Sequence, residues 1–245
     1  MGQVLTNRQV RRRQAGHWWT TLLDLVLPAE CAGCGHTGSR DVVDGLCPGC
    51  ALALTGPPRL VRPQRRPAGF PGVHALAPYH DPIPEIVIAH KERGRIDLAR
   101  PLGRQLARAV LAAAGSEPEF WLIPAPSAGR STRKRGHDPV RRMARSAARE
   151  LRARGRVANV LPALRHVRTV ADQAGLDRWQ RAQNLAGALG VRGTAADLVL
   201  LRPAVLVDDV VTSGATLAEA ARALRAAGGR PIGAAVLGAT GFSGS

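Results

Sequence analysis

The sequence predicts an α/β fold, a parallel sheet with helices on both faces, preceded by a small zinc-ribbon-like module at the N-terminus. From residue 73 onward, short apolar runs alternate with longer segments of helical periodicity, a pattern typical of parallel sheets. All four cysteines fall between Cys31 and Cys50. A chain of 245 residues has room for one such domain and for one appendage too short to form a core alone.

Changes of composition divide the chain into five predicted segments. These are a basic arm (1–17), an N-terminal helix with the cysteine module (18–54), a Pro- and Arg-rich linker (55–72), the α/β domain (73–240) and a short tail (241–245). The helix is predicted from the spacing of Trp18, Leu22 and Leu25 before Pro28. Because Asp24 interrupts this apolar run and no small-residue cleavage site follows, we do not interpret it as a signal peptide. No stretch is long and apolar enough for a membrane span, and we expect a cytoplasmic protein.

The elements of the α/β domain are predicted from their periodicity. Strands are expected over 73–79, 120–123, 157–164, 203–208 and 232–237, and helices over 83–91, 98–110, 139–151 and 216–227. Asp138 is a favourable N-cap for the third helix, with Pro139 at its first position. Strands alternating with helices in this way form a parallel sheet, because each helix returns the chain to the same end of the sheet.

The chain is strongly basic, with 35 Lys and Arg against 18 Asp and Glu and a formal net charge of +17. Such a charge attracts phosphate groups, whether on a small molecule or on a nucleic acid. Nearly all the cations are arginines, since Lys91 and Lys134 are the only lysines. That bias, in a chain also rich in Ala and Gly, is typical of GC-rich coding, so a solvated basic surface is the alternative interpretation.

The most informative segment follows the apolar run at 204–207. Asp208 and Asp209 come directly after this predicted strand, and a short loop then leads into a helix. The loop consists of Val210, Val211, Thr212, Ser213, Gly214, Ala215 and Thr216. A phosphate fits where such a helix begins, because its first N–H groups lack partners and the dipole is positive there. Carboxylates repel phosphate, so we expect the acidic pair to hold sugar hydroxyls or a magnesium ion. The alternative is that the two aspartates merely end a strand.

This order of strand, acidic pair, Thr/Gly loop and helix resembles the 5-phosphoribosyl 1-pyrophosphate signature of type I phosphoribosyltransferases. The resemblance implies the Rossmann-like sheet of that family. It also implies that Asp208 and Asp209 hold the ribose, that residues 212–216 hold its terminal phosphate, and that Mg²⁺ accompanies the pyrophosphate. Other nucleotide motifs are missing, since the sequence has neither a Gly-Lys-Ser/Thr phosphate loop nor a G-x-G-x-x-G after a strand.

Cations for the pyrophosphate group are expected on a second loop. Pro126 and Ser127 follow the strand predicted at 120–123 and join the candidate binding residues, and the basic residues after them are Arg130, Arg133, Lys134 and Arg135. Such a loop can bring positive charge to a leaving pyrophosphate, and Lys91 is a candidate for the same role. With the acidic pair, Lys91 and Arg135 are therefore the candidate catalytic residues. An exposed basic loop without a ligand is the alternative.

Further spacings resemble the ComF/GntX-like family, whose members are similar to type I phosphoribosyltransferases and also begin with a four-cysteine module. The matching positions are Gln173, Leu176, Arg181 and Asn184, together with Arg135-Gly136 and Lys91-x-x-Gly94. The resemblance extends from about Leu22 to Thr240 and makes Gln173, Arg181 and Asn184 candidate motif residues. One place departs from it, because Arg135-Gly136-His137-Asp138 stands where the family usually has Arg-Gly-Phe-Asn.

The cysteine spacing predicts a metal site. Cys31-x₂-Cys34 and Cys47-x₂-Cys50 are two thiolate pairs on short turns, and four such sulfurs can surround Zn²⁺ tetrahedrally. With no open ligand position the zinc would be structural, holding a segment too short to fold by burial alone. An iron–sulfur cluster or two disulfides are the alternatives.

Two functions from different classes remain open at this point. As an enzyme, the protein would bind phosphoribosyl pyrophosphate with Mg²⁺ and transfer the phosphoribosyl group to an unidentified nitrogen nucleophile. The resemblance to ComF proteins implies the second, a non-catalytic competence protein that handles single-stranded DNA or contacts DNA-processing proteins. The net charge of +17 suits a DNA backbone, whereas an aromatic content of 3% argues against a base-stacking platform.

Overall fold

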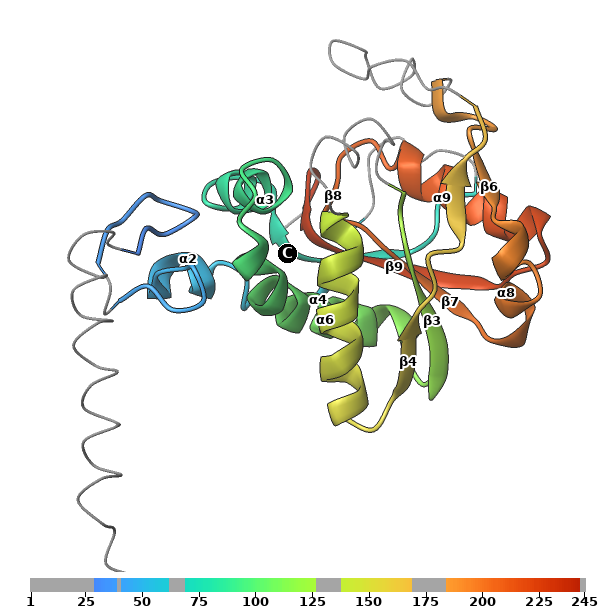
Figure 1. Cartoon of the computed structure of the whole chain (residues 1–245), viewed down its shortest axis with the longest axis horizontal. Helices are drawn as coiled ribbons and strands as arrows, with labels where there is room; N and C mark the ends of the chain where they lie inside the picture. The colour runs from blue at the N-terminus through green and yellow to red at the C-terminus, as the bar shows by residue number, and fades with distance from the viewer. Residues whose placement is uncertain (1–28, 39–40, 62–68, 127–137, 169–183, 243–245) are drawn as a thin grey trace, which may run out of the picture.

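The computed structural model describes residues 29–38, 41–61, 69–126, 138–168 and 184–242. It confirms the predicted fold class, a mainly parallel sheet with helices on both faces and a four-cysteine module at the N-terminal side. In Figure 1 the module lies at one end of the molecule, beside α3, and the α8 and α9 region lies at the other. The basic arm and the helix predicted after it fall outside the described residues.

The elements have the following bounds. The strands are β1 (Arg59–Val61), β2 (Val73–Pro78), β3 (Glu119–Pro124), β4 (Val157–Val160), β5 (Leu164–His166), β6 (Leu189–Val191), β7 (Ala204–Val207), β8 (Val210–Val211) and β9 (Pro231–Ala239). The α-helices are α2 (Pro48–Leu52), α3 (Ile83–Lys91), α4 (Ala99–Ala114), α6 (Pro139–Ala153), α8 (Leu198–Leu201) and α9 (Ala215–Ala226), and short 3₁₀ turns η1 (Ile96–Leu98) and η2 (Gly193–Ala195) precede α4 and α8.

The main sheet has the strand order β1-β2-β9-β7-β3-β4, with β8 paired to the end of β9. From β2 to β4 neighbouring strands run parallel, and β1 is added antiparallel at the β2 edge. This edge strand lies in the predicted linker and was not predicted as a strand. Its pairing places Leu60 opposite His74 and buries Val61.

One predicted strand is wrong. The run 157–164 is divided, because β4 ends at Val160 and β5 begins only at Leu164, where it pairs antiparallel with β6 in a separate two-stranded sheet. Pro162 lies between the two strands. It has no N–H to donate to a ladder and restricts the residue before it, which explains why the pairing with β3 ends there.

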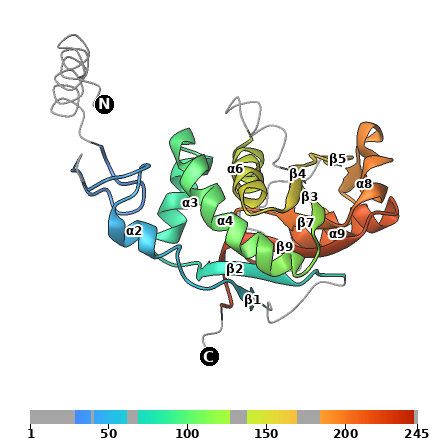
Figure 2. The same ribbon diagram turned by 90° about the horizontal axis from the view of Figure 1, so that it is seen from below.

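The helices divide between the two faces of the sheet. α3, α4 and α6 pack with Val205 and Val207 in one core, and α9 packs with Ala204 and Leu206 in the other. Figure 2 shows α4 and α6 side by side along one face. They cross closely at Gly103, where a Cβ would lie 2.3 Å from the Cβ of Ser146. The alternation along β7 therefore determines which helix each residue faces.

The cysteine module shares the larger core. Cys31, Leu46, Cys50 and Leu54 are buried together with Ile86 of α3 and Leu102 of α4. A Cβ at Gly33 would lie 2.7 Å from Sγ of Cys50 and 3.0 Å from Ile86 Cγ1, so the first cysteine turn touches α3 directly. Within the described ranges, no helix has the length and apolar character that crossing a bilayer requires.

Candidate functional site

The sheet topology places a switch point, where the direction of strand addition reverses, between β3 and β7. β3 and β7 are neighbours in the sheet. After β3 the next strand of this sheet, β4, is added on the side of β3 away from β7, whereas β9 lies on the side of β7 away from β3. In open α/β sheets, ligands bind outside the carboxyl ends of two such strands. Val207 ends β7 opposite Pro124 at the end of β3, and the N–H of Ala125 donates to the Val207 carbonyl. The acidic pair follows Val207 at this position.

The two aspartates differ in their surroundings. Asp208 is partly buried, and its Oδ1 accepts a hydrogen bond of 2.9 Å from the N–H of Asp209. The Asp209 side chain is only 8% exposed, and its Oδ1 accepts a bond of 2.9 Å from the N–H of Val210. Its Oδ2 lies 2.7 Å from Nζ of Lys91, the last residue of α3. The ammonium is therefore the partner of the second Asp209 oxygen, which is buried and accepts no other hydrogen bond from the described residues.

Electrostatics distinguishes the pair further. Burial, with the neighbouring Asp209 carboxylate second, raises the pKa of Asp208 to about 8, although the Lys91 charge acts in the opposite direction. Tyr79, directly after β2, has its hydroxyl pKa raised by burial and by the Asp209 charge. At neutral pH Asp208 therefore keeps its proton, and Lys91 lies against the neighbouring Asp209. Tyr79 was not among the sequence candidates, although its place after a predicted strand was a signal for it.

The loop after the acidic pair turns into α9 at Gly214. This residue has φ = +79° and is the N-cap of the helix, and the N–H of Ala215 lies 3.4 Å from Oγ of Ser213. The first N–H groups of α9 point to the same end of the sheet as the acidic pair. Phe70 packs on Gly214, where a Cβ would lie 2.4 Å from its Cε2. No sequence pattern predicts this contact, because the two residues lie far apart along the chain.

The structure brings part of the predicted site together. Asp208, Asp209, Lys91, Pro126 and the loop 210–216 all lie at the carboxyl edge of the sheet. Ser127, Arg135, Gln173 and Arg181 lie outside the described residues. Asn184 begins a described range, and its carbonyl accepts a hydrogen bond of 2.8 Å from Arg168.

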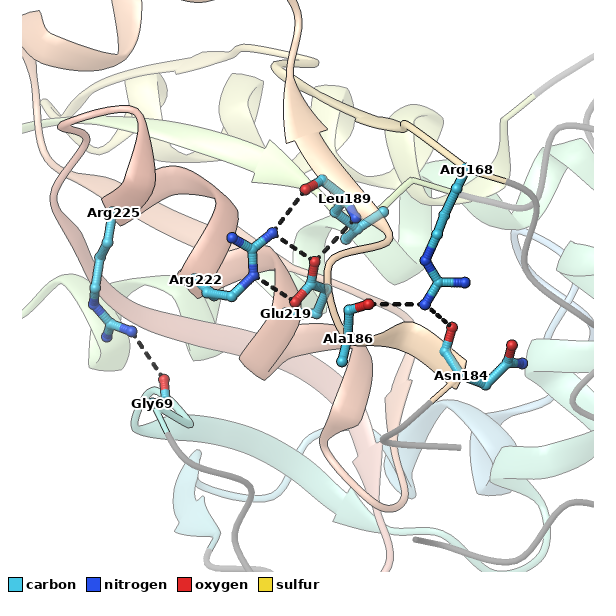
Figure 3. A network of polar contacts seen from close by, with 8 residues as sticks. All are labelled: Gly69, Arg168, Asn184, Ala186, Leu189, Glu219, Arg222 and Arg225. Carbon is cyan, nitrogen blue, oxygen red and sulfur yellow. Dashed lines mark hydrogen bonds and ion pairs between the residues drawn. The ribbon is translucent and has the colours of Figure 1, made fainter. Parts of the chain in front are cut away.

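The segment around Asn184 is held on α9 by a polar network (Figure 3). Glu219 of α9 is buried, and its Oε1 accepts a bond of 3.0 Å from the N–H of Leu189. Arg222 binds both Glu219 oxygens at 2.7 Å and also donates to the Leu189 carbonyl. Arg168 donates at 2.8 Å to the carbonyls of Asn184 and Ala186. Helix α9, which begins within the loop 210–216, therefore also anchors the β5–β6 sheet.

The four cysteines form a second candidate site. Their Sγ atoms all lie within 4.8 Å of one another, and those of Cys34 and Cys47 are 3.7 Å apart. Four sulfurs at about 2.3 Å from one tetrahedral ion would be about 3.8 Å apart, so the cluster fits a metal site. No disulfide joins these four thiols. Burial raises the pKa of the Cys31 thiol, but backbone N–H groups, that of Cys47 first, more than offset this and lower it to about 6. Burial and the Cys31 sulfur raise the pKa of Cys50.

Together the fold and its two sites define a class of protein. It is an α/β protein with a mainly parallel sheet, an acidic pair and a helix N-terminus at the carboxyl end of β7, and a four-cysteine cluster packed on the same core. Comparison with protein-family models and with curated protein sequences gives no match for this chain.

Proposed function

We propose that this protein binds 5-phosphoribosyl 1-pyrophosphate with Mg²⁺ and transfers its phosphoribosyl group to a nitrogen nucleophile. One observation carries the proposal: an acidic pair and the N-terminus of α9 lie together outside the carboxyl ends of β3 and β7. A phosphate suits the N–H groups of a helix start, and a carboxylate suits sugar hydroxyls. A phosphorylated pentose presents both groups.

The chemistry follows from what these groups can hold. The C1–O bond to pyrophosphate breaks as the bond from the nucleophile's nitrogen to C1 forms, and the nitrogen loses a proton. Negative charge builds up on the leaving pyrophosphate. Mg²⁺, when bound, would neutralise charge on that group. The basic residues that follow Pro126 in the sequence, Arg135 among them, would serve the same purpose. Residues 212–216 hold the terminal phosphate and keep the sugar in place.

A ligand-induced shift of the thermal unfolding temperature tests the proposal. Phosphoribosyl pyrophosphate with Mg²⁺ should raise the Tm of the full chain, by an amount that grows with ligand concentration. The double variant Asp208→Asn/Asp209→Asn should lose that shift. Asp197→Asn removes an exposed carboxylate at the start of α8 and serves as the matched control, which should keep the shift. An unchanged shift in the double variant, or no shift in the wild-type protein, would contradict the assignment.

For the cysteine cluster we propose a structural Zn²⁺ ion. Four thiolates without an open position suit a structural zinc, and the cluster packs against α3 rather than facing a crevice. This module and the phosphoribosyl site together support the resemblance to ComF/GntX-like proteins. Such a protein, with thiolates bound to metal, suits the reducing cytoplasm.

A second candidate function, binding of single-stranded DNA, is favoured by one surface. The outer face of α6 carries Arg142, Arg145, Arg149 and Arg152, all exposed. Their spacing of three and four residues places them in one stripe along the helix. Ten residues of helix span about 15 Å, which is enough to contact several phosphates of a strand.

The salt dependence of DNA binding tests this candidate. Fluorescence anisotropy with a labelled oligothymidylate should give an affinity that falls steeply with added salt. Changing Arg142, Arg145 and Arg149 to Ser should reduce the slope of log K against log [salt] by about 2. The matched control changes three exposed arginines elsewhere, Arg93, Arg192 and Arg230, and removes the same charge. Equal effects of the two triple variants would mean that α6 is not the DNA surface.

A further inference from the structure

The four cysteines of the candidate metal site differ in their exposure to solvent. Cys31 and Cys50 are buried, with 1% and 4% of their surface exposed, whereas Cys34 is exposed and Cys47 is half-buried. Each of the two turns therefore contributes one buried cysteine and one cysteine that solvent reaches. The two outer sulfurs, those of Cys34 and Cys47, come from different turns and lie 3.7 Å apart.

The protein itself holds the two buried cysteines in place. Sγ of Cys31 accepts a hydrogen bond of 3.2 Å from the N–H of Cys47. Sγ of Cys50 lies so close to Gly33 that a Cβ there would be 2.7 Å away. Both cysteines belong to the core that the module shares with α3 and α4. A bond between the outer sulfurs can therefore form while the buried pair stays where it is.

We propose that Cys34 and Cys47 are an oxidation-sensitive pair: a hydroperoxide converts them to a disulfide, and the proposed zinc ion is released. Susceptibility to peroxide follows thiolate character, exposure and the presence of a second thiol nearby. Metal ligation keeps cysteines deprotonated, Cys34 is exposed, and Cys47 supplies the second sulfur. Cys34 also stands between two glycines, of which Gly35 has φ = +71°, so its turn can shift at little steric cost.

The reaction takes two steps. The Cys34 thiolate attacks one oxygen of hydrogen peroxide, so that an S–O bond forms, the O–O bond breaks and hydroxide leaves. The Cys47 thiolate then attacks the Cys34 sulfur, an S–S bond forms, the S–O bond breaks and a second hydroxide leaves. The two thiolates thereby lose two electrons to the peroxide. Cys31 and Cys50 remain as ligands, which are too few for a tetrahedral zinc site, so the ion dissociates.

Peptide mapping of the zinc-loaded full chain tests this pairing. The protein is treated with hydrogen peroxide, its free thiols are alkylated, and it is digested with trypsin without reduction. Cleavage after Arg40 separates the two cysteine turns, so a disulfide between them joins peptide 14–40 to peptide 41–59. The expected product is this linked peptide with the alkyl label on Cys31 and Cys50. A zinc-binding dye should report one ion released for each disulfide, and a thiol reductant with Zn²⁺ should restore the loaded protein.

The variant Cys34→His provides a second test. Histidine is also a zinc ligand, and the exposed position leaves room for its ring, so the variant should bind zinc without the reacting thiolate. It should keep its zinc at a peroxide dose that empties the wild-type protein. The matched control is Thr37→His, which adds an exposed imidazole to the same module, keeps all four thiolates and should lose zinc as the wild-type protein does. Should Cys34→His fail to bind zinc, the peptide map alone decides.

Several results would overturn the pairing of Cys34 with Cys47. These are a disulfide within either turn, a disulfide that involves Cys31 or Cys50, no disulfide at all, or disulfide formation without loss of zinc. A protein that takes up no zinc would contradict the proposed structural ion as well. None of these measurements involves phosphoribosyl pyrophosphate, so their outcome is independent of the proposed sugar site.

Discussion

The ring of Phe70 lies against the backbone of Gly214, so closely that a Cβ on the glycine would be 2.4 Å from Cε2 of the ring. Gly214 is the residue from which α9 begins, and its φ of +79° is one that glycine adopts freely. Phe70 comes shortly before β2, and Arg225 of α9 donates to the carbonyl of Gly69 beside it. The end of the predicted linker thus helps to support the loop 210–216.

Gly214→Ala should therefore damage both stability and ligand binding. The left-handed conformation costs a residue with a Cβ about 1–2 kcal/mol, and the overlap with Phe70 adds to this. Urea unfolding measures the loss, and titration with phosphoribosyl pyrophosphate measures the binding. The control is Gly49→Ala in α2, where no atom lies within 4 Å of the added Cβ. Equal stability of the two variants would contradict the close packing.

The stability of the protein should fall as the pH rises from about 5 to about 8. An unfolded aspartate loses its proton near pH 4, whereas Asp208 in the folded state has a pKa of about 8 and keeps it. Between these values the folded state holds more protons, so the free energy of unfolding decreases with pH. Urea unfolding at about pH 5 and about pH 8 measures the change. Asp208→Asn should reduce the slope, and Asp197→Asn should leave it unaltered.

Removal of the proposed zinc should weaken the proposed sugar site as well as the module. Cys50 touches Gly33, Gly33 touches Ile86 of α3, and α3 ends at Lys91, which pairs with Asp209. Loss of the ion would free the cysteine turns and loosen this helix. Treatment with a strong chelator, or the change Cys34→Ser, should lower the Tm and the affinity for phosphoribosyl pyrophosphate together. Metal content is measured by atomic absorption. An unchanged affinity in the metal-free protein would show that the two sites are independent.

Glu219→Ala should destabilise the protein far more than the loss of an exposed ion pair. Glu219 is buried and binds Leu189 N–H and Arg222, so its removal leaves these donors without their acceptor. We expect a loss of about 2–3 kcal/mol in urea unfolding. Glu85→Ala, which removes the exposed partner of Arg93, should cost less than about 1 kcal/mol. Similar losses in the two variants would contradict the role of the network in Figure 3.

The regular elements were predictable because each has a local cause. Asp138 caps the helix that begins at Pro139, and the Asp138 side chain accepts a hydrogen bond from the Arg141 N–H, as expected. The α3 bounds agree with the periodicity of residues 83–91. The sequence prediction ran across Pro162 because the apolar run continues past it, whereas in the structure the proline, which lacks an N–H, ends the pairing with β3 and the chain then pairs with β6.

By itself the sequence determined which chemical groups the protein possesses, namely the acidic pair with its loop and four cysteines in two close pairs. These are local features, and their order along the chain is enough to recognise them. The tertiary structure alone decided that Lys91 pairs with Asp209, and that Phe70 covers Gly214. Such contacts join residues more than a hundred positions apart. They depend on strand order and on which face of the sheet each side chain takes, and no spacing along the chain encodes either.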